Sequence, residues 1–415
     1  MSLARRFVGK LTFPLHVLSI DSKTSHFCHH HSIKFNCSPH RLPQYRLYAS
    51  ASSRELPEGS MSSKILKYKK WLSLGLFGLT LSIVAYRRRK KNDDDPRLPG
   101  ARKLPRPLGR MKMITYKGFT IPEEVIPTVK ALKDFQFRED DVVITSFPKT
   151  GVTWLQEIVW LIANDLNFDG ALTSPLQERF PFLEWPLPGV PAISAMAERR
   201  FIKTHLPPTI LFKPLEEGSP NSSEVKPKVI SIIRNPKDTA ISYFCFARMN
   251  KLIDFKDIFD DFLLFFLPGQ VPYGPIAEHY IDVLRLQKQF GKEERKQSDQ
   301  RVLIIQYEEL HFHFQREIDK LCDFLGKPRL DAEKMKALQD HCSFRLMSVN
   351  RMVNYEHWDE LGLRNLDEAR FFRSGKVGDW QKYIDKQQND ALNKWIAADF
   401  GGIFEFKFGD ESFVE

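Results

Sequence analysis

The chain has 415 residues, 42% of them hydrophobic, enough for one large domain with extensions. Its net charge of +10 is uneven: residues 1–110 carry 22 Lys/Arg and 6 Asp/Glu, whereas the other 305 residues carry 40 basic and 46 acidic side chains. The globular part is therefore mildly acidic, which argues against a nucleic-acid partner. Five cysteines without a C-x-x-C pair argue against a disulfide framework and favour a reducing compartment.

Residues 1–48 resemble a mitochondrial targeting presequence. They hold seven Lys/Arg and one acid, Asp21, and open on a basic, amphipathic stretch. A disordered basic tail is the alternative, and a third interpretation is that translation starts at Met61. Residues 49–70 are interpreted as a linker.

Residues 71–86 are uncharged and apolar, with lysines before them and a run of arginines and lysines after them. Sixteen helical residues span about 24 Å, short of a hydrocarbon core of about 30 Å, but basic side chains at both ends can make up the difference. This pattern predicts a transmembrane anchor. Residues 87–110, with charges and four prolines, are interpreted as a basic linker. Together these segments predict a mitochondrial membrane location, or alternatively a membrane-anchored enzyme facing the cytosol.

From Met111 onward, apolar strand runs alternate with helical patterns. Strands are predicted at 141–145, 228–234 and 301–307, and helices at 154–164, 255–266 and 276–290. Nearly continuous apolar strands are typical of parallel sheets covered on both faces. Residues 111–415 therefore predict one α/β domain with a central, mainly parallel sheet flanked by helices.

The segment Ile144–Trp154 is predicted to run from a buried strand through a bend into a helix. Lys149 and several hydroxyl side chains lie in the bend, next to Gly151. Backbone N–H groups at a helix start, with a lysine beside them, bind anions. The pattern GxxxxGK[ST] is absent, so this is not a Walker A loop.

Three further motifs each place a chemically capable side chain beside a strand end or a glycine-rich turn. Phe201–Pro207 is a short strand that ends in Lys203-Thr204-His205, and an imidazole has a pKa suited to general base work. Arg234 ends another strand, and Ser242 follows eight residues later; a guanidinium and a hydroxyl suit a phosphate. The fourth motif is Phe371–Trp380, which contains Arg373 and two glycines.

These four ordered motifs closely resemble those of the cytosolic-type sulfotransferases, over about 300 residues from near Lys117 to near Phe408. The resemblance implies a P-loop-like nucleotide-binding sulfotransferase fold for residues 111–415. It implies transfer of a sulfuryl group from 3′-phosphoadenosine 5′-phosphosulfate (PAPS) to a hydroxyl or amine of a small, hydrophobic acceptor, without a metal.

The resemblance also implies residue roles. His205 would be the general base, Lys149 would stabilise the leaving phosphate, and Lys203 would hold the transferring group. The implied donor-binding residues are Lys149, Thr150, Gly151, Val152, Thr153, Trp154, Arg234, Ser242, Tyr307, Cys342, Phe344, Arg373, Ser374 and Gly375. The implied acceptor-binding residues are Phe147, Phe182, Trp185, Lys203 and Phe246.

The sequence departs from the family pattern at several of these positions. Ser374 stands where the family has a lysine, and Val152 and Cys342 stand where it has threonines. The family's dimer motif after Trp380 is replaced by Gln381, Asp385, Lys386 and Asp390, which leaves the oligomeric state open. Two alternatives are a membrane-tethered nucleotide-binding scaffold with weak or no catalysis, and a Golgi sulfotransferase acting on glycans.

Overall fold

The computed structural model describes residues 95–184, 189–212, 226–291 and 300–409, all within the unit Leu74–Glu415. The predicted presequence 1–48, the linker 49–70 and the predicted anchor 71–86 lie outside the described residues. Among the residues that are described, no helix is both long and apolar enough to cross a membrane.

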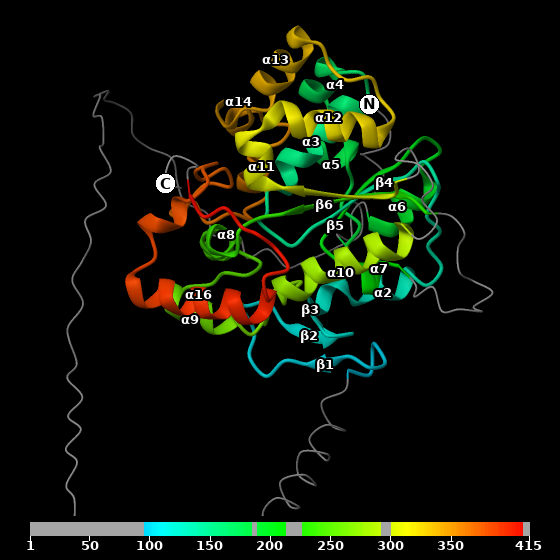
Figure 1. Cartoon of the computed structure of the whole chain (residues 1–415). Coiled ribbons are helices and arrows are strands. Elements are labelled where there is room, and N and C mark those ends of the chain that lie inside the picture. Colours follow the sequence, from blue (N-terminus) through cyan, green and yellow to red (C-terminus); the bar gives the residue numbers. More distant parts are fainter. Residues whose placement is uncertain (1–94, 185–188, 213–225, 292–299, 410–415) are drawn as a thin grey trace, which may run out of the picture. The chain divides into compact units, whose positions relative to one another are not determined.

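Four parallel strands form the central sheet, in the order β5-β4-β6-β7. The strands are β4 (Val142–Thr145), β5 (Phe201–Thr204), β6 (Lys228–Ile233) and β7 (Val302–Gln306). They are largely buried, as their continuous apolar runs predicted. The expected α/β architecture with a parallel sheet is therefore confirmed (Figure 1).

Alternating side chains of the strands enter two separate hydrophobic clusters. Val142 and Ile144 of β4 pack with helices α3, α12 and α13, whereas Val143 packs on the other side with α2, α7 and α10. This follows from the two-residue period of a strand. The bounds are α3 (Val152–Ala163), α12 (Phe314–Leu325), α13 (Ala332–His341), α2 (Ile126–Ala131), α7 (Pro208–Leu211) and α10 (Ile276–Phe290).

A small antiparallel sheet, which the sequence patterns did not predict, packs near the second cluster. It consists of β1 (Arg102–Lys103), β2 (Met113–Tyr116) and β3 (Phe119–Pro122), in that order. Leu98, Ala101 and Leu108 are buried, although they lie in the stretch 87–110 that was interpreted as a linker. The folded part of the chain therefore begins before Met111.

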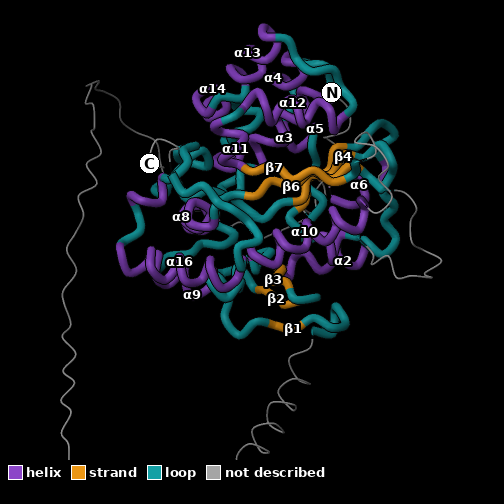
Figure 2. Tube along the Cα trace, viewed as in Figure 1, coloured by secondary structure: helices purple, strands orange, loops and turns teal. Residues whose placement is uncertain are grey.

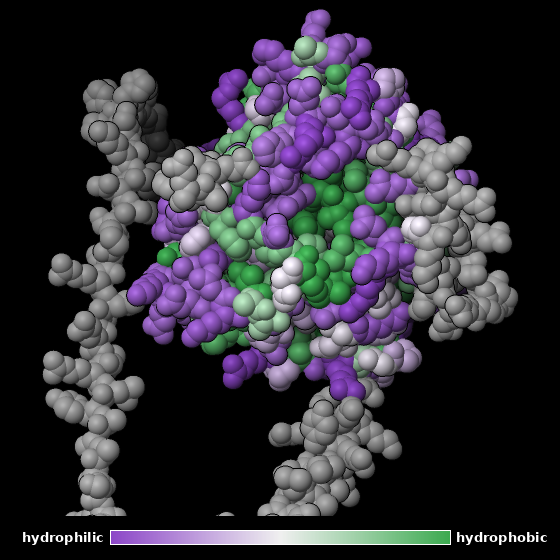
Figure 3. Space-filling model, viewed as in Figure 1, coloured by the Kyte–Doolittle hydropathy of each residue, from purple (hydrophilic) through white to green (hydrophobic). Residues whose placement is uncertain are grey.

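A third hydrophobic cluster gathers α8 (Pro236–Met249), α9 (Phe259–Phe266) and α16 (Lys386–Phe400), which lie together at one side of the sheet (Figure 2). Shorter helices complete the described part of the domain: α4 (Phe168–Thr173), α5 (Leu176–Arg179), α6 (Gly189–Ala195), α11 (Tyr307–Phe312), α14 (Phe344–Val349) and α15 (His357–Glu360), with 3-10 turns at Glu123–Val125 and Asp379–Lys382. In Figure 3, hydrophobic residues gather near the middle of the visible face, and hydrophilic residues surround them.

Candidate active site

A cavity of about 1180 Å³ lies at the carboxyl edge of the parallel sheet. The four strands run in one direction, so the segments that follow them meet at this edge. Each contributes to the cavity wall: Lys149 follows β4, His205 follows β5, Arg234 follows β6, and Tyr307 follows β7. The motifs recognised in the sequence therefore converge because of the sheet topology.

The loop between β4 and α3 has the backbone geometry of an anion site. Gly151 caps α3 with a φ of 103°, and a Cβ atom there would lie 2.6 Å from Cδ2 of Tyr307. Only glycine combines this conformation with this close approach. Lys149 also has a positive φ, of 70°, and the hydroxyl of Thr150 donates to the carbonyl of Phe147 at 2.8 Å. The loop thus holds Lys149 at the start of a helix, where N–H groups favour anions.

The Lys149 side chain is partly buried and lies between aromatic rings. Its Nζ atom lies 4.6 Å from the ring centre of Phe246 and 4.1 Å from that of Phe371. Burial, followed by the positive charge of Lys203, lowers the pKa of Lys149 to about 7. A negatively charged ligand therefore stabilises the protonated form of Lys149 more than it would stabilise that of an exposed lysine.

His205 is held from several sides. Its Nδ1 atom lies 2.7 Å from the carbonyl oxygen of Ser146, which can only accept, so Nδ1 carries the proton. Burial, and then the charge of Lys203, hold the pKa of His205 well below its usual value, so the ring is neutral. The unprotonated nitrogen is therefore Nε2. The backbone N–H of His205 donates to Glu184, whose carboxylate also accepts from Leu206.

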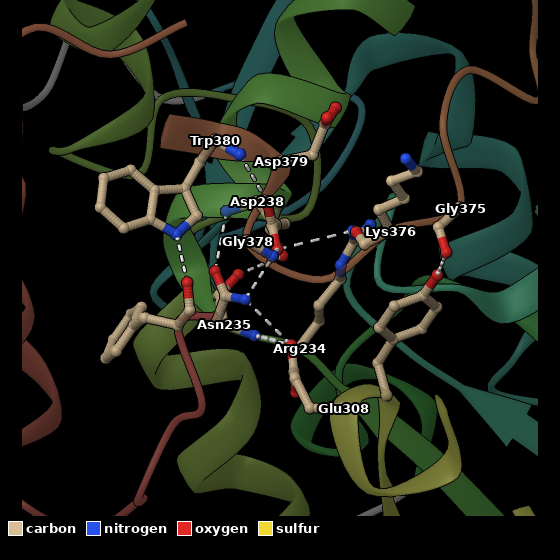
Figure 4. Close-up of polar contacts among 12 residues, drawn as sticks. Arg234, Asn235, Asp238, Glu308, Gly375, Lys376, Gly378, Asp379 and Trp380 are labelled. Carbon is tan, nitrogen blue, oxygen red and sulfur yellow. Dashed lines mark hydrogen bonds and ion pairs between the residues drawn. The ribbon is translucent and has the colours of Figure 1, made fainter. Parts of the chain in front are cut away.

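The segment Phe371–Trp380, named here the closing segment, lies across the ends of β6 and β7. Nη2 of Arg234 donates to the carbonyl of Lys376 at 3.0 Å, and the hydroxyl of Tyr307 donates to the carbonyl of Gly375 at 3.2 Å (Figure 4). The guanidinium of Arg234 stacks on the Tyr307 ring, 4.2 Å from its centre. These contacts bring Arg373, Ser374 and Gly375 to the cavity wall.

Among the described residues, five polar atoms of cavity-lining side chains are buried without a hydrogen-bond partner. Two are the oxygens Oε1 of Gln156 and Oε2 of Glu184, and three are donors: Nε of Arg234, Nε of Arg373 and Nε1 of Trp154. A buried donor without a partner costs free energy, so such donors are normally satisfied by a ligand or water. Two guanidinium N–H groups from separate segments fit an anion such as a phosphate. The residues present thus suit a phosphorylated nucleotide.

Aromatic side chains form the end of the cavity next to these arginines. Trp154 lies edge-on to Tyr307, with ring centres 5.5 Å apart. Phe344 is 40% exposed, an unusual exposure for phenylalanine. A Cβ atom on Gly375 would lie 2.3 Å from the Phe344 ring, so the closing segment packs directly on it. Trp154 and Phe344 therefore present aromatic surface that suits a base.

Most residues implied by the resemblance line this single cavity. They are Lys149, Gly151, Val152, Thr153, Trp154, Phe182, Lys203, His205, Arg234, Ser242, Phe246, Tyr307, Cys342, Phe344, Arg373, Ser374 and Gly375. Thr150 and Phe147 are not among its lining residues: both are fully buried, and Phe147 packs on Tyr243, Phe266 and His279. Trp185 lies outside the described residues.

Sequence reasoning missed several residues that support the site. Glu184 binds the backbone at His205, Tyr273 packs against the His205 ring at 5.3 Å, and Phe371 covers Lys149. Phe371 is the first residue of the fourth motif, and Glu184 directly precedes Trp185, but no sequence pattern indicated what either residue contacts. Among the described residues, no group of three or more His, Cys, Asp or Glu side chains is placed to hold a metal ion.

The fold and site define an α/β protein with an anion-binding cavity at its parallel sheet, and a model of the sulfotransferase domain matches residues 139–404, so the chain belongs to the sulfotransferase family. It is similar to Sulfotransferase 1B1 of Mus musculus, with 34% identity over 267 residues, covering 63% of this chain and 83% of the relative. Cytosolic sulfotransferase 1 of Danio rerio is 31% identical over 291 residues, which cover 69% and 91% of the two chains.

A solved structure of retinol dehydratase, in a complex with retinol and PAP, has the same fold. Its TM-score is 0.61 at 26% sequence identity, and the match covers 72% of this chain and 92% of that chain. The family expected from the four motifs is confirmed, and the protein is a sulfotransferase.

The comparisons contradict the predicted mitochondrial membrane location. The relatives that the chain matches include a cytosolic sulfotransferase. The prediction rested on the composition of residues 1–91, outside the part of the chain that the structure describes. Basic and apolar composition alone was not sufficient evidence for a membrane location.

Proposed function

We propose that this enzyme transfers a sulfuryl group from PAPS to the hydroxyl or amine of a small, hydrophobic acceptor. One observation carries the proposal. The neutral imidazole of His205, with Nε2 unprotonated, shares a cavity with Lys149 and with two buried guanidinium N–H groups that lack partners. A general base, a leaving-group cation and a phosphate site are what sulfuryl transfer from this donor needs.

The donor would lie along the ends of β4, β6 and β7. Arg234, Arg373 and Ser242 would hold the 3′-phosphate, and the loop from Lys149 to Thr153 would hold the 5′-phosphosulfate. Trp154 and Phe344 would stack on the adenine, with Tyr307 and Cys342 beside it. The PAP in the retinol dehydratase complex supports a donor of this class.

His205 would act as the general base. Its Nε2 would take the proton from the acceptor while the acceptor oxygen or nitrogen forms a bond to sulfur. The bond between sulfur and the 5′-phosphate oxygen breaks, its electron pair stays on that oxygen, and the Lys149 ammonium stabilises the charge. Lys203, whose amino group lies 4.3 Å from the Phe182 ring centre, would hold the transferring group from the acceptor side.

The acceptor would bind beside His205, between apolar side chains. Phe182 and Tyr273 flank the imidazole with ring centres at 5.3 Å, and Phe246 lies on the Lys149 side. Such walls favour an apolar acceptor with one reacting polar group. The relative with 26% identity is bound to retinol, a hydrophobic alcohol, which supports this choice.

The test is to incubate the purified full chain with radiolabelled PAPS and a panel of apolar alcohols, phenols and amines. We expect label on at least one apolar acceptor and formation of PAP. Ser374, in place of a family lysine, favours the alternative of a nucleotide-binding scaffold with weak or no catalysis. Binding of PAP without transfer to any acceptor would support that alternative and contradict the proposal.

A further inference from the structure

Asp238, in the first turn of α8, has no role among the residues discussed above, yet it is fully buried at the centre of a hydrogen-bond network. Oδ2 of Asp238 accepts the backbone N–H of Gly378 at 2.8 Å, and Oδ1 accepts that of Trp380 at 2.9 Å (Figure 4). These donors belong to the closing segment, 140 or more residues away in sequence. One carboxylate therefore joins the helix that carries Ser242 to the segment that carries Arg373.

The position of this carboxylate is itself fixed. Asn235 caps α8: its side-chain oxygen accepts the backbone N–H of Asp238 at 2.8 Å, and its amide group donates to Oδ2 at 2.9 Å. Glu308 in turn accepts from the backbone and side chain of Asn235. A negative charge in the first turn of a helix is also favoured by the helix dipole. Asp238 is thus a rigid attachment point.

The attachment at Asp238 lies next to the proposed nucleotide site. Asp238 and Ser242 are four residues apart and lie on the same face of α8. Arg234 precedes the helix by two residues and donates to the carbonyl of Lys376 in the closing segment. The closing segment is therefore bound directly over the residues proposed to hold the 3′-phosphate.

Asp379 links this attachment to Arg373. Asp379 lies between the two residues whose N–H groups Asp238 accepts, and its carboxylate pairs with Nη1 of Arg373. The Nε atom of Arg373 is buried without a partner. Fixing the backbone on both sides of Asp379 thus fixes the carboxylate that orients Arg373.

We propose that Asp238 is a positioning residue for recognition of the donor's 3′-phosphate, because it holds the closing segment and, through Asp379, the guanidinium of Arg373. This inference rests on the proposed function. It also accounts for Ser374: a segment held in place by Asp238, Arg234 and Tyr307 does not depend on the family's lysine to stay closed.

The experiment compares two nucleotides on the full chain: PAP, and adenosine 5′-monophosphate, which lacks the 3′-phosphate. For Asp238→Ala we expect the Kd for PAP to rise about tenfold, as expected from the loss of two charge-assisted hydrogen bonds, while the Kd for adenosine 5′-monophosphate stays unchanged. Asp238→Asn, which keeps one acceptor oxygen, should give a smaller rise and serves if Asp238→Ala does not fold.

Asp141→Ala is the matched control. Asp141 is equally buried and pairs with Arg200, but it is not a lining residue of the cavity. It should lower stability without changing the ratio of the two Kd values. If the Asp238 variants leave that ratio at the wild-type value, the inference is overturned. If the wild-type protein itself does not prefer PAP, the proposed function fails.

A second readout does not require a nucleotide. Trypsin cleaves after Arg370, Arg373 and Lys376, so loss of the attachment should expose these sites in the ligand-free chain. Mass spectrometry monitors cleavage at these positions. We expect cleavage to be faster than in the wild type in both Asp238 variants and to have the wild-type rate in Asp141→Ala. Equal rates in all four proteins would contradict the role of Asp238 whatever the donor is.

Discussion

Two sides of the cavity are held in different ways. On one side, His205 and Arg234 directly follow β5 and β6, and Lys149 lies four residues after β4. The register of these adjacent parallel strands therefore sets where the three residues lie. On the other side, the closing segment has no regular structure before Asp379, and side chains of Asp238, Arg234 and Tyr307 hold its backbone. We call the strand side the rigid side and the side formed by the closing segment the attached side. We propose that the side chains on the rigid side carry out the reaction and that recognition of the nucleotide depends on the attached side.

The largest expected effect tests the rigid side. His205→Ala should lower turnover by roughly 10²- to 10⁴-fold, the usual contribution of a general base, while PAP affinity stays the same because the strand ends are undisturbed. Turnover is measured by transfer of label from PAPS, and affinity by calorimetry. Near-normal turnover in this variant would exclude His205 as the base.

The next effect tests the attached side. Gly375→Ala should raise the Kd for PAP by about tenfold or more, because the Cβ atom would lie 2.3 Å from Phe344 and the residue has a φ of +67°. Calorimetry with PAP measures the change. Gly326→Ala is the control, since Gly326 has a φ of +70° with nothing within 4 Å of its Cβ. Equal effects of the two variants would assign the loss to backbone strain alone.

The pH dependence of PAP binding tests Lys149. The pKa of Lys149 is lowered to about 7 by burial and by Lys203, and the phosphates of a bound nucleotide would raise it. Binding then takes up a proton above pH 7, so the Kd should rise with pH by up to about tenfold per unit and level off below pH 7. In Lys149→Met this contribution to the pH dependence should be missing. The same slope in wild type and variant would contradict the assignment.

The variant with the smallest expected effect adds a positive charge to the closing segment. Ser374→Lys should tighten PAP binding by about three- to tenfold, equivalent to about 0.7–1.4 kcal/mol, because it adds a cation to a segment that is already in place. The gain should shrink as ionic strength rises. A gain far larger than this would mean that the attached side is not closed in the present protein.

The sequence predicted the sheet side of the site well. β4, β6 and β7 lie within their predicted ranges, and α10 has the predicted bounds, because continuous apolar runs and helical periodicity are local signals. The motifs at strand ends could be joined into one site because parallel strands share a carboxyl edge. The antiparallel sheet β1–β3 was missed because β1 has two residues within a stretch of prolines and charges that resembles a linker, and because β2 and β3 have only four residues each.

The sequence by itself determined the family and the α/β class, and it identified many, but not all, of the side chains that line the cavity. It did not determine where the protein resides, and composition of the first residues misled that prediction. Only the tertiary structure decided which nitrogen of His205 is free, since the carbonyl of Ser146 lies 59 residues away, and how the closing segment is held. Such contacts join backbone atoms to distant side chains, and backbone atoms, being the same in every residue, leave no pattern in a sequence.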